Sequence, residues 1–142
     1  MGAKRIEDLV TYQFAVEFRD EVQRLLRDSP TGARDFRFAA QLRDSASGVA
    51  STVTEGFHRR RPAEFAQFLR YSGASLAEAR NWIQDGIGRG HWTAQDAGTA
   101  LAWHDRCRQA IEALRASQAR RARERRPQAE KPHRAPPRTD RQ

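Results

Sequence analysis

The sequence predicts an all-α protein: an antiparallel up-down-up-down four-helix bundle followed by a disordered basic C-terminal tail. Apolar residues recur at steps of three and four along four segments, and no segment alternates apolar and polar residues as a half-buried strand would. Short connections between the segments favour antiparallel neighbours. A chain of 142 residues can form one core but not two, so we assign residues 1–116 to the bundle and 117–142 to the tail.

The first helix is expected over residues 6–26, with an apolar stripe made of Ala15, Phe18, Val22 and Leu25. Pro30 and Gly32 then interrupt the pattern, because neither is tolerated cheaply inside a helix. The stripe of the second helix consists of Ala39, Leu42, Ala46, Val49 and Val53. Gly56 has the place of a helix stop, because glycine adopts the left-handed conformation without a steric penalty.

The third helix is expected to begin at Pro62, whose missing N–H would be unpaired at that position anyway. Its stripe consists of Phe65, Leu69, Ser72, Leu76, Ala79 and Ile83. Gly86, Gly88 and Gly90 end it, and Thr93 to Asp96 then resembles a capping box. The stripe of the fourth helix consists of Ala97, Ala100, His104, Cys107, Ile111 and Leu114.

Seven aromatic residues lie off these stripes or at their edges: Phe14, Phe36, Phe57, Tyr71, Trp82, Trp92 and Trp103. One interpretation is that they widen the core of a single bundle. The other is that some of them form a second apolar face between subunits. The sequence leaves both interpretations open.

The net charge of +8 is concentrated in the tail. Residues 1–114 carry 16 Lys and Arg against 15 Asp and Glu, whereas residues 115–142 carry 10 against 3. The tail has no large apolar residue and cannot bury enough surface to offset the entropy of ordering. We therefore expect the last helix to fray through residues 120–126 and disorder to follow from Pro127.

The compartment is inferred from what the sequence contains. A single cysteine, Cys107, cannot form an internal disulfide, which suits a reducing compartment. No segment has the apolar length of a signal peptide or a membrane span. We expect a cytoplasmic protein that does not enter a membrane.

A pattern in the second and third helices is similar to a known family. It lies in QLRDSASGVASTVTEGFHRRRPAEFAQFLRYSGASLAEA and consists of Gln41, Arg43, Glu55, Gly56, Arg59, Arg60, Glu64, Phe65, Phe68, Leu69, Ser75, Leu76 and Glu78. It resembles the four-helix-bundle family that includes the protein encoded in 23S ribosomal RNA intervening sequences and the accessory variability determinant (Avd) of diversity-generating retroelements. Helix order and lengths agree over residues 6–115.

The chain departs from the family pattern in three places. It has Thr52-Val53-Thr54 in place of the usual Asn-Ile-Ala, His58 where Gly is common, and Arg61 where Ser is frequent. Because Arg61 cannot accept a capping hydrogen bond, the start of the third helix should be weaker by about 1 kcal/mol. The resemblance implies a ring-like homopentamer with a basic surface. In the retroelement branch it implies partnership with a reverse transcriptase and nucleic acid.

Four basic residues precede the third helix, where the helix macrodipole is positive and each base costs roughly 0.3 to 1 kcal/mol. A bound phosphate would offset this cost by using both the charges and the free N–H groups of the helix start. The alternative is a solvated corner neutralised by Glu55, Glu64 or Asp44, with Glu55 pairing to an arginine or capping the helix. The candidate nucleic-acid-binding residues are His58, Arg59, Arg60 and Arg61, with Arg120, Arg121, Arg123, Arg125 and Arg126 as auxiliary contacts.

Catalytic and metal sites have little support. Glu55 and His58 have the Glu-x-x-His spacing of di-iron bundles, but no second pair accompanies them. His104 and Cys107 could form half of a zinc site or a thiol pair, although a buried histidine with a soft neighbour is favoured. There is no phosphate loop or nucleophile motif, so we predict neither an enzyme nor a cofactor.

The sequence therefore predicts a non-catalytic, homo-oligomeric accessory protein that binds RNA or an RNA–protein complex mainly through phosphates. The accessory subunit of a retroelement reverse transcriptase is the specific case that the resemblance implies. The alternative is a structural homo-oligomer that binds only protein, with its aromatic residues forming the interface. RNA and DNA are not distinguished at this level.

Overall fold

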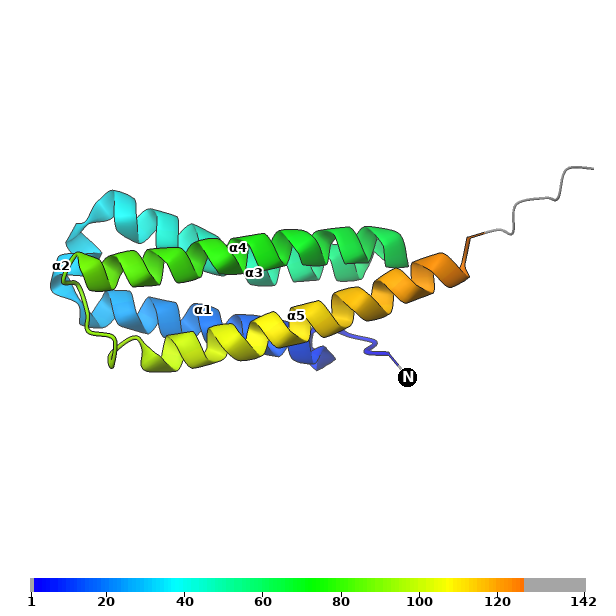
Figure 1. The fold of residues 1–142 in the computed structure, drawn as a ribbon, viewed down its shortest axis with the longest axis horizontal. Helices are drawn as coiled ribbons and strands as arrows, with labels where there is room; N and C mark the ends of the chain where they lie inside the picture. The colour runs from blue at the N-terminus through cyan, green and yellow to red at the C-terminus, as the bar shows by residue number, and fades with distance from the viewer. Residues whose placement is uncertain (1, 127–142) are drawn as a thin grey trace, which may run out of the picture.

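The computed structural model describes residues 2–126, and within them it contains helices and no strands. The elements are a short 3-10 helix, η1 (Ile6–Asp8), and the α-helices α1 (Val10–Asp28), α2 (Pro30–Arg34), α3 (Phe36–Arg59), α4 (Pro62–Gly88) and α5 (Gly98–Glu124). The four long helices α1, α3, α4 and α5 alternate in direction along the chain (Figure 1). The predicted up-down-up-down bundle is confirmed.

The long helices pack around a square. α1 contacts α3 and α5, and α4 contacts the same two helices, so α1 and α4 lie on a diagonal. α5 extends beyond the end of the bundle at which α3 turns into α4, and the N-terminal segment lies at that end too (Figure 1). We call this the turn end, and α2 lies at the opposite end.

The predicted apolar stripes form the core. All stripe positions are buried except Leu114, which is half-buried: Ala15, Phe18, Val22, Leu25, Ala39, Leu42, Ala46, Val49, Val53, Phe65, Leu69, Ser72, Leu76, Ala79, Ile83, Ala97, Ala100, His104, Cys107 and Ile111. The one hydroxyl in the α4 stripe, Ser72 Oγ, lies 2.6 Å from Thr52 Oγ1 on α3. Ser72 Oγ also donates to the Phe68 carbonyl at 3.1 Å, so this buried hydroxyl is hydrogen-bonded, as a buried polar group must be to avoid a large cost.

Gly56 is not a helix stop, which corrects the prediction from the sequence. α3 continues through Gly56 to Arg59, and Arg60 is the residue in the left-handed conformation, with φ of 60°. A Cβ at position 56 would lie 2.7 Å from Phe68 Cβ and 2.9 Å from Phe65 Cδ1. Glycine is therefore required here because α4 approaches the α3 backbone closely.

The segment after α1 is also more regular than predicted. Residues Pro30–Arg34 form the short helix α2, in which Pro30 occupies the first turn and loses no hydrogen bond. Ser29 Oγ caps this helix by accepting from the Gly32 N–H at 3.1 Å. The break expected at Pro30 and Gly32 is thus a change of helix direction rather than a loop.

The connection from α4 to α5 is built around Trp92. Its indole Nε1 donates to the Ile83 carbonyl at 3.0 Å, and a side chain at Gly86 would overlap its ring. The reciprocal bonds of the predicted capping box form: the Asp96 N–H donates to Thr93 Oγ1 at 3.1 Å, and the Thr93 N–H donates to Asp96 Oδ2 at 3.2 Å. They close a turn that precedes α5 and do not cap the helix, whose N-cap is Ala97 without a side-chain cap.

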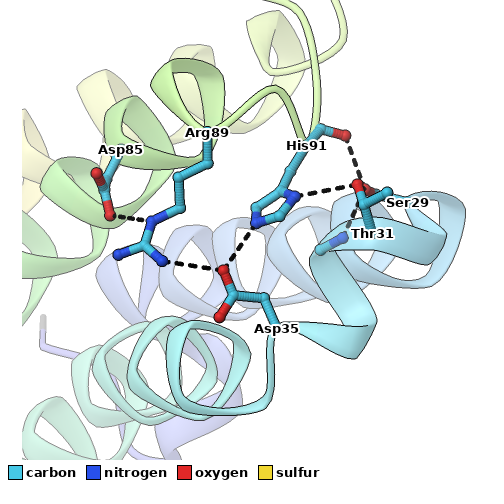
Figure 2. A network of polar contacts seen from close by, with 7 residues as sticks. Ser29, Thr31, Asp35, Asp85, Arg89 and His91 are labelled. Atoms are coloured by element: carbon cyan, nitrogen blue, oxygen red, sulfur yellow. Dashed lines mark hydrogen bonds and ion pairs between the residues drawn. The ribbon is translucent and has the colours of Figure 1, made fainter.

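A polar network closes the end of the bundle opposite the turn end (Figure 2). Asp35 Oδ2 accepts from Arg89 Nη1 at 3.0 Å and lies 3.0 Å from His91 Nε2. Arg89 Nε also donates to Asp85 at 2.8 Å, and Ser29 Oγ donates to the His91 carbonyl at 2.7 Å. The hydrogen bond from His91, followed by that from Arg89, holds the pKa of Asp35 below its usual value. The network joins the start of α3 to the end of α4.

The structure divides the seven aromatic residues between the two interpretations. Trp92 is buried, and four others are half-buried against the core: Phe14, Phe57, Trp82 and Trp103. Phe36 and Tyr71 are 80% and 48% exposed. A wider core therefore accounts for five of these rings, and only Phe36 and Tyr71 are open to a second apolar face.

Residues 117–124, which we assigned from the sequence to the tail, are helical, because α5 continues to Glu124. The helix continues because the positions that extend the apolar stripe of α5 are still partly covered by the bundle, and Gln118 among them is buried at the turn end. The part of the predicted disordered tail from Pro127 onward lies outside the described residues.

Candidate nucleic-acid interface

An open cleft of about 570 Å³ lies at the turn end of the bundle. The N-terminal segment, the turn between α3 and α4, and one face of α5 line it. Among the described residues in its lining none is acidic, and the cationic ones are Lys4, Arg60, Arg61, Arg121 and Arg125. We call this site the basic cleft.

The α3–α4 turn presents two of these cations. The left-handed backbone of Arg60 ends α3, at a steric cost of roughly 1 to 2 kcal/mol for a residue other than glycine. Arg61 is the N-cap of α4 and gives no side-chain cap, as predicted from the loss of the family's serine. The first α4 backbone hydrogen bond runs from the Phe65 N–H to the Arg61 carbonyl. The Ala63 N–H comes before this bond in the first turn of α4, so it has no acceptor within the helix, and it lies at the helix end where the dipole is positive.

The other two members of the basic run do not line the cleft, so the structure does not bring all four candidate residues into this one site. Arg59 pairs with Glu55 at 3.2 Å and lies over the Phe68 ring at 5.1 Å. His58 Nδ1 lies 2.9 Å from the Thr54 carbonyl, one turn back on α3. Because both residues still belong to the helix, they follow its exposed face instead of the turn.

Neutralisation of the basic corner by carboxylates is therefore limited. Arg61 Nη1 lies 3.9 Å from Glu64 Oε1, and the two side chains are 79% and 42% exposed. Such a pair contributes little to stability. Lys4, Arg60, Arg121 and Arg125 form no ion pair with any residue between 2 and 126. The cleft thus retains most of its positive charge.

The contribution of α5 could have been found in the sequence. Leu114, Gln118, Arg121 and Arg125 follow one another at steps of four, three and four, so they continue the buried stripe of α5 along the same helix face. Of the predicted auxiliary arginines, Arg121 and Arg125 line the cleft, whereas Arg120, Arg123 and Arg126 do not. From the sequence we expected a fraying helix over residues 120–126 and grouped all five arginines, so the selection that an intact helix makes among them was missed.

Two features of the cleft were not predicted. Its lining includes four large apolar side chains, Leu9, Phe57, Phe65 and Leu114, which together we call the floor. Gln118 also lines it and is only 8% exposed, and its amide has no hydrogen-bond partner among the described residues. No fully inaccessible polar side-chain atom in residues 2–126 lacks a partner, so the Gln118 amide must keep its remaining exposed surface toward the cleft.

Several residues of the pattern that carries the family resemblance have packing positions. Gly56 and Phe65 meet where α3 crosses α4, and Ser75 lies opposite Gly48, whose added Cβ would be 3.3 Å from Ser75 Oγ. Glu78 accepts from Trp82 Nε1 at 3.5 Å. Glu55 pairs with Arg59 rather than capping α4, which decides between its two predicted roles, and Glu64 lies in the first turn of α4.

His104 and Cys107, the candidate half of a zinc site or thiol pair on α5, are both buried in the core of the bundle. Burial raises the pKa of the Cys107 thiol to about 12, so the thiol stays protonated and is a poor nucleophile. His104 Nδ1 lies 2.9 Å from Asp105 Oδ1. Within residues 2–126 no three His, Cys, Asp or Glu side chains gather as metal ligands would.

No helix in the described part of the chain combines the length and the apolar composition that crossing a membrane requires.

The fold and the cleft define a small helical-bundle protein with a basic end, most of whose cations form no ion pair within residues 2–126. The chain belongs to the family of 23S rRNA-intervening sequence proteins, whose sequence profile matches residues 7–113. The family resemblance of the second and third helices is thereby confirmed. No curated protein matches the chain. The matched segment contains Arg60 and Arg61, whereas Lys4, Arg121 and Arg125 lie outside it.

Proposed function

We propose that the protein is a non-catalytic accessory protein that binds RNA through the basic cleft, mainly by contacts to phosphates. The observation that carries the proposal is that five cations from three parts of the chain line one cleft, and within the described chain only Arg61 forms an ion pair, with Glu64 at 3.9 Å. Membership of a family named after ribosomal RNA supports RNA as the polyanion.

The electrostatics favour binding over a structural role. Like charges gathered around one cleft repel one another, and their exposure to solvent keeps this repulsion small, whereas an exposed arginine that only served solubility could lie anywhere on the surface. Phosphates bound in the cleft would relieve this repulsion. The protonated Cys107 thiol supports a role without nucleophilic catalysis.

Anisotropy of a labelled RNA hairpin, titrated between about 50 and 200 mM KCl, tests the proposal. Arg60→Ala/Arg61→Ala and Arg121→Ala/Arg125→Ala should each weaken binding. For every phosphate that a variant no longer binds, the slope of log affinity against log salt should become shallower by about 0.7 to 0.9. Duplex DNA in parallel titrations measures any preference for RNA.

A matched control removes the same charge elsewhere. Arg34 and Arg37 are exposed near the end of the bundle opposite the turn end, and neither forms an ion pair with a described residue. Arg34→Ala/Arg37→Ala should leave the salt slope nearly unchanged. Absence of binding at the lowest salt, or an equal loss in this control, would show that the basic cleft is not the site.

The finer forms of the proposal are a homopentamer, which would repeat the cleft around a ring, and a reverse-transcriptase partner. Native mass spectrometry tests the first, and a monomer at micromolar concentration would contradict it. Co-purification with a reverse transcriptase encoded beside the chain tests the second. The protein-only scaffold would need Phe36 and Tyr71, the two exposed rings, and would bind without salt dependence.

A further inference from the structure

We infer that the basic cleft holds one unpaired nucleotide of the bound RNA, with its base on the apolar floor and its flanking phosphates on the cations. This inference rests on the proposed function and narrows it from a phosphate-binding surface to a site for single-stranded nucleic acid. Three features of the cleft carry it: its volume, its floor and Gln118.

The volume and the floor exceed what phosphates alone require. A surface that collects phosphates can be flat, whereas about 570 Å³ falls in the range of roughly 300 to 1,000 Å³ typical of pockets that enclose a small molecule. Phe57 is half-buried, and its ring centroid lies 6.3 Å from that of Phe65. Aromatic side chains of this kind stack unpaired bases in RNA-binding proteins.

Gln118 adds a group that matches a base edge. A glutamine amide carries a donor and an acceptor side by side, as the hydrogen-bonding edge of a base does. In this cleft the residue is only 8% exposed, and its amide forms no hydrogen bond within residues 2–126. The amide atoms keep contact with solvent, so a base that pairs with them exchanges hydrogen bonds to water for hydrogen bonds to the protein and gains a fixed orientation.

The cations are placed to hold the backbone on either side of that base. Arg60 and Arg61 come from the α3–α4 turn, Arg121 and Arg125 from α5, and Lys4 from the N-terminal segment. In a duplex the base edges are already paired and the bases stacked, so no base can reach the floor. The cleft should therefore favour loops, bulges and ends over helical RNA.

The test uses two RNA hairpins that differ only in the position of a 2-aminopurine, in the loop or in the stem. Emission of the loop probe should change on binding and that of the stem probe should not. Gln118→Met keeps the length of the side chain without the amide, and Phe57→Leu keeps an apolar floor without the ring. Each variant should bind the hairpin roughly 3- to 10-fold more weakly and bind a blunt duplex as the wild type does.

Gln109→Met is the matched control, because Gln109 is exposed on α5 outside the cleft. Circular dichroism and thermal unfolding verify that each variant is folded. Gln118→Met is compared with Phe57→Leu, because the Phe57 substitution can also change the packing of the bundle. Equal affinity for hairpin and duplex with a silent loop probe would overturn the inference. If Arg60→Ala/Arg61→Ala still weakened binding in that case, the phosphate-binding function would stand. If no RNA bound, both would be wrong.

Discussion

Replacing Gly56 by alanine tests how α3 and α4 pack against each other. The added Cβ would lie 2.7 Å from Phe68 Cβ and 2.9 Å from Phe65 Cδ1, and carbon atoms that are not bonded overlap at both distances. Phe68 Cβ is bonded directly to the α4 backbone, so no rotation of its side chain can relieve the overlap. The helices themselves would have to separate.

Two opposing effects set the magnitude. Alanine is the better helix former by about 0.8 to 1.0 kcal/mol in a helix interior. Overpacking of a filled core typically costs about 1 to 3 kcal/mol, and the upper part of that range applies because the contact involves an atom fixed to the backbone. Gly56→Ala should therefore reduce the free energy of unfolding by about 1 to 2 kcal/mol, which lowers Tm by several degrees at this chain length.

Urea unfolding followed by far-UV circular dichroism measures this change. Gly73→Ala is the control, since Gly73 lies inside α4 and an added Cβ would have as its nearest neighbour Ile111 Cγ2, at 4.0 Å. Without an overlap, that variant should gain about 0.4 to 1 kcal/mol. If Gly56→Ala were as stabilising as Gly73→Ala, the close approach of α4 to Gly56 would be refuted.

Three further predictions concern single residues. Arg60→Gly should stabilise the fold by about 1 kcal/mol, because glycine relieves the left-handed backbone, and should weaken RNA binding; urea unfolding and anisotropy measure the two effects. The pKa of Asp35 is lowered by the hydrogen bonds from His91 and Arg89. The ionised Asp35 carboxylate therefore stabilises the fold fully above its usual pKa of 3.8, and this stabilisation is lost as the pH falls through the lower folded-state pKa. In acid unfolding, the free energy of unfolding of Asp35→Asn should therefore depend less on pH in that range. Because burial raises the pKa of Cys107 to about 12, a thiol reagent at about pH 8 should label this residue only after denaturation.

Each of these predictions has a clear contradiction. Arg60→Ala keeps the left-handed strain but loses the guanidinium, so equal stabilities of the Ala and Gly variants would argue against strain at this residue. Identical acid-unfolding curves for Asp35→Asn and the wild type would show that the ion pairs of Asp35 do not contribute. Rapid labelling of native Cys107 would mean that α5 opens readily.

The sequence indicated the α-helices and their inward faces because helical periodicity is a local property. The stripe from Ala15 to Leu25 and that from Phe65 to Ile83 are buried as the spacing of three and four residues requires. The basic turn was also visible, since Arg60 and Arg61 precede Pro62. Gly56 was misread because a glycine near a helix end has the same local signature whether it ends the helix or admits a neighbour.

Only the tertiary structure decided which charged residues share a site. Lys4, Arg60 and Arg121 are far apart in the chain, and their meeting depends on how far α5 extends past the α3–α4 turn. The same axial alignment buried Gln118, whose amide has no hydrogen-bond partner in the described chain. Periodicity fixes the angle of a residue around its own helix, but its height relative to a neighbouring helix is set by the packing of the whole bundle.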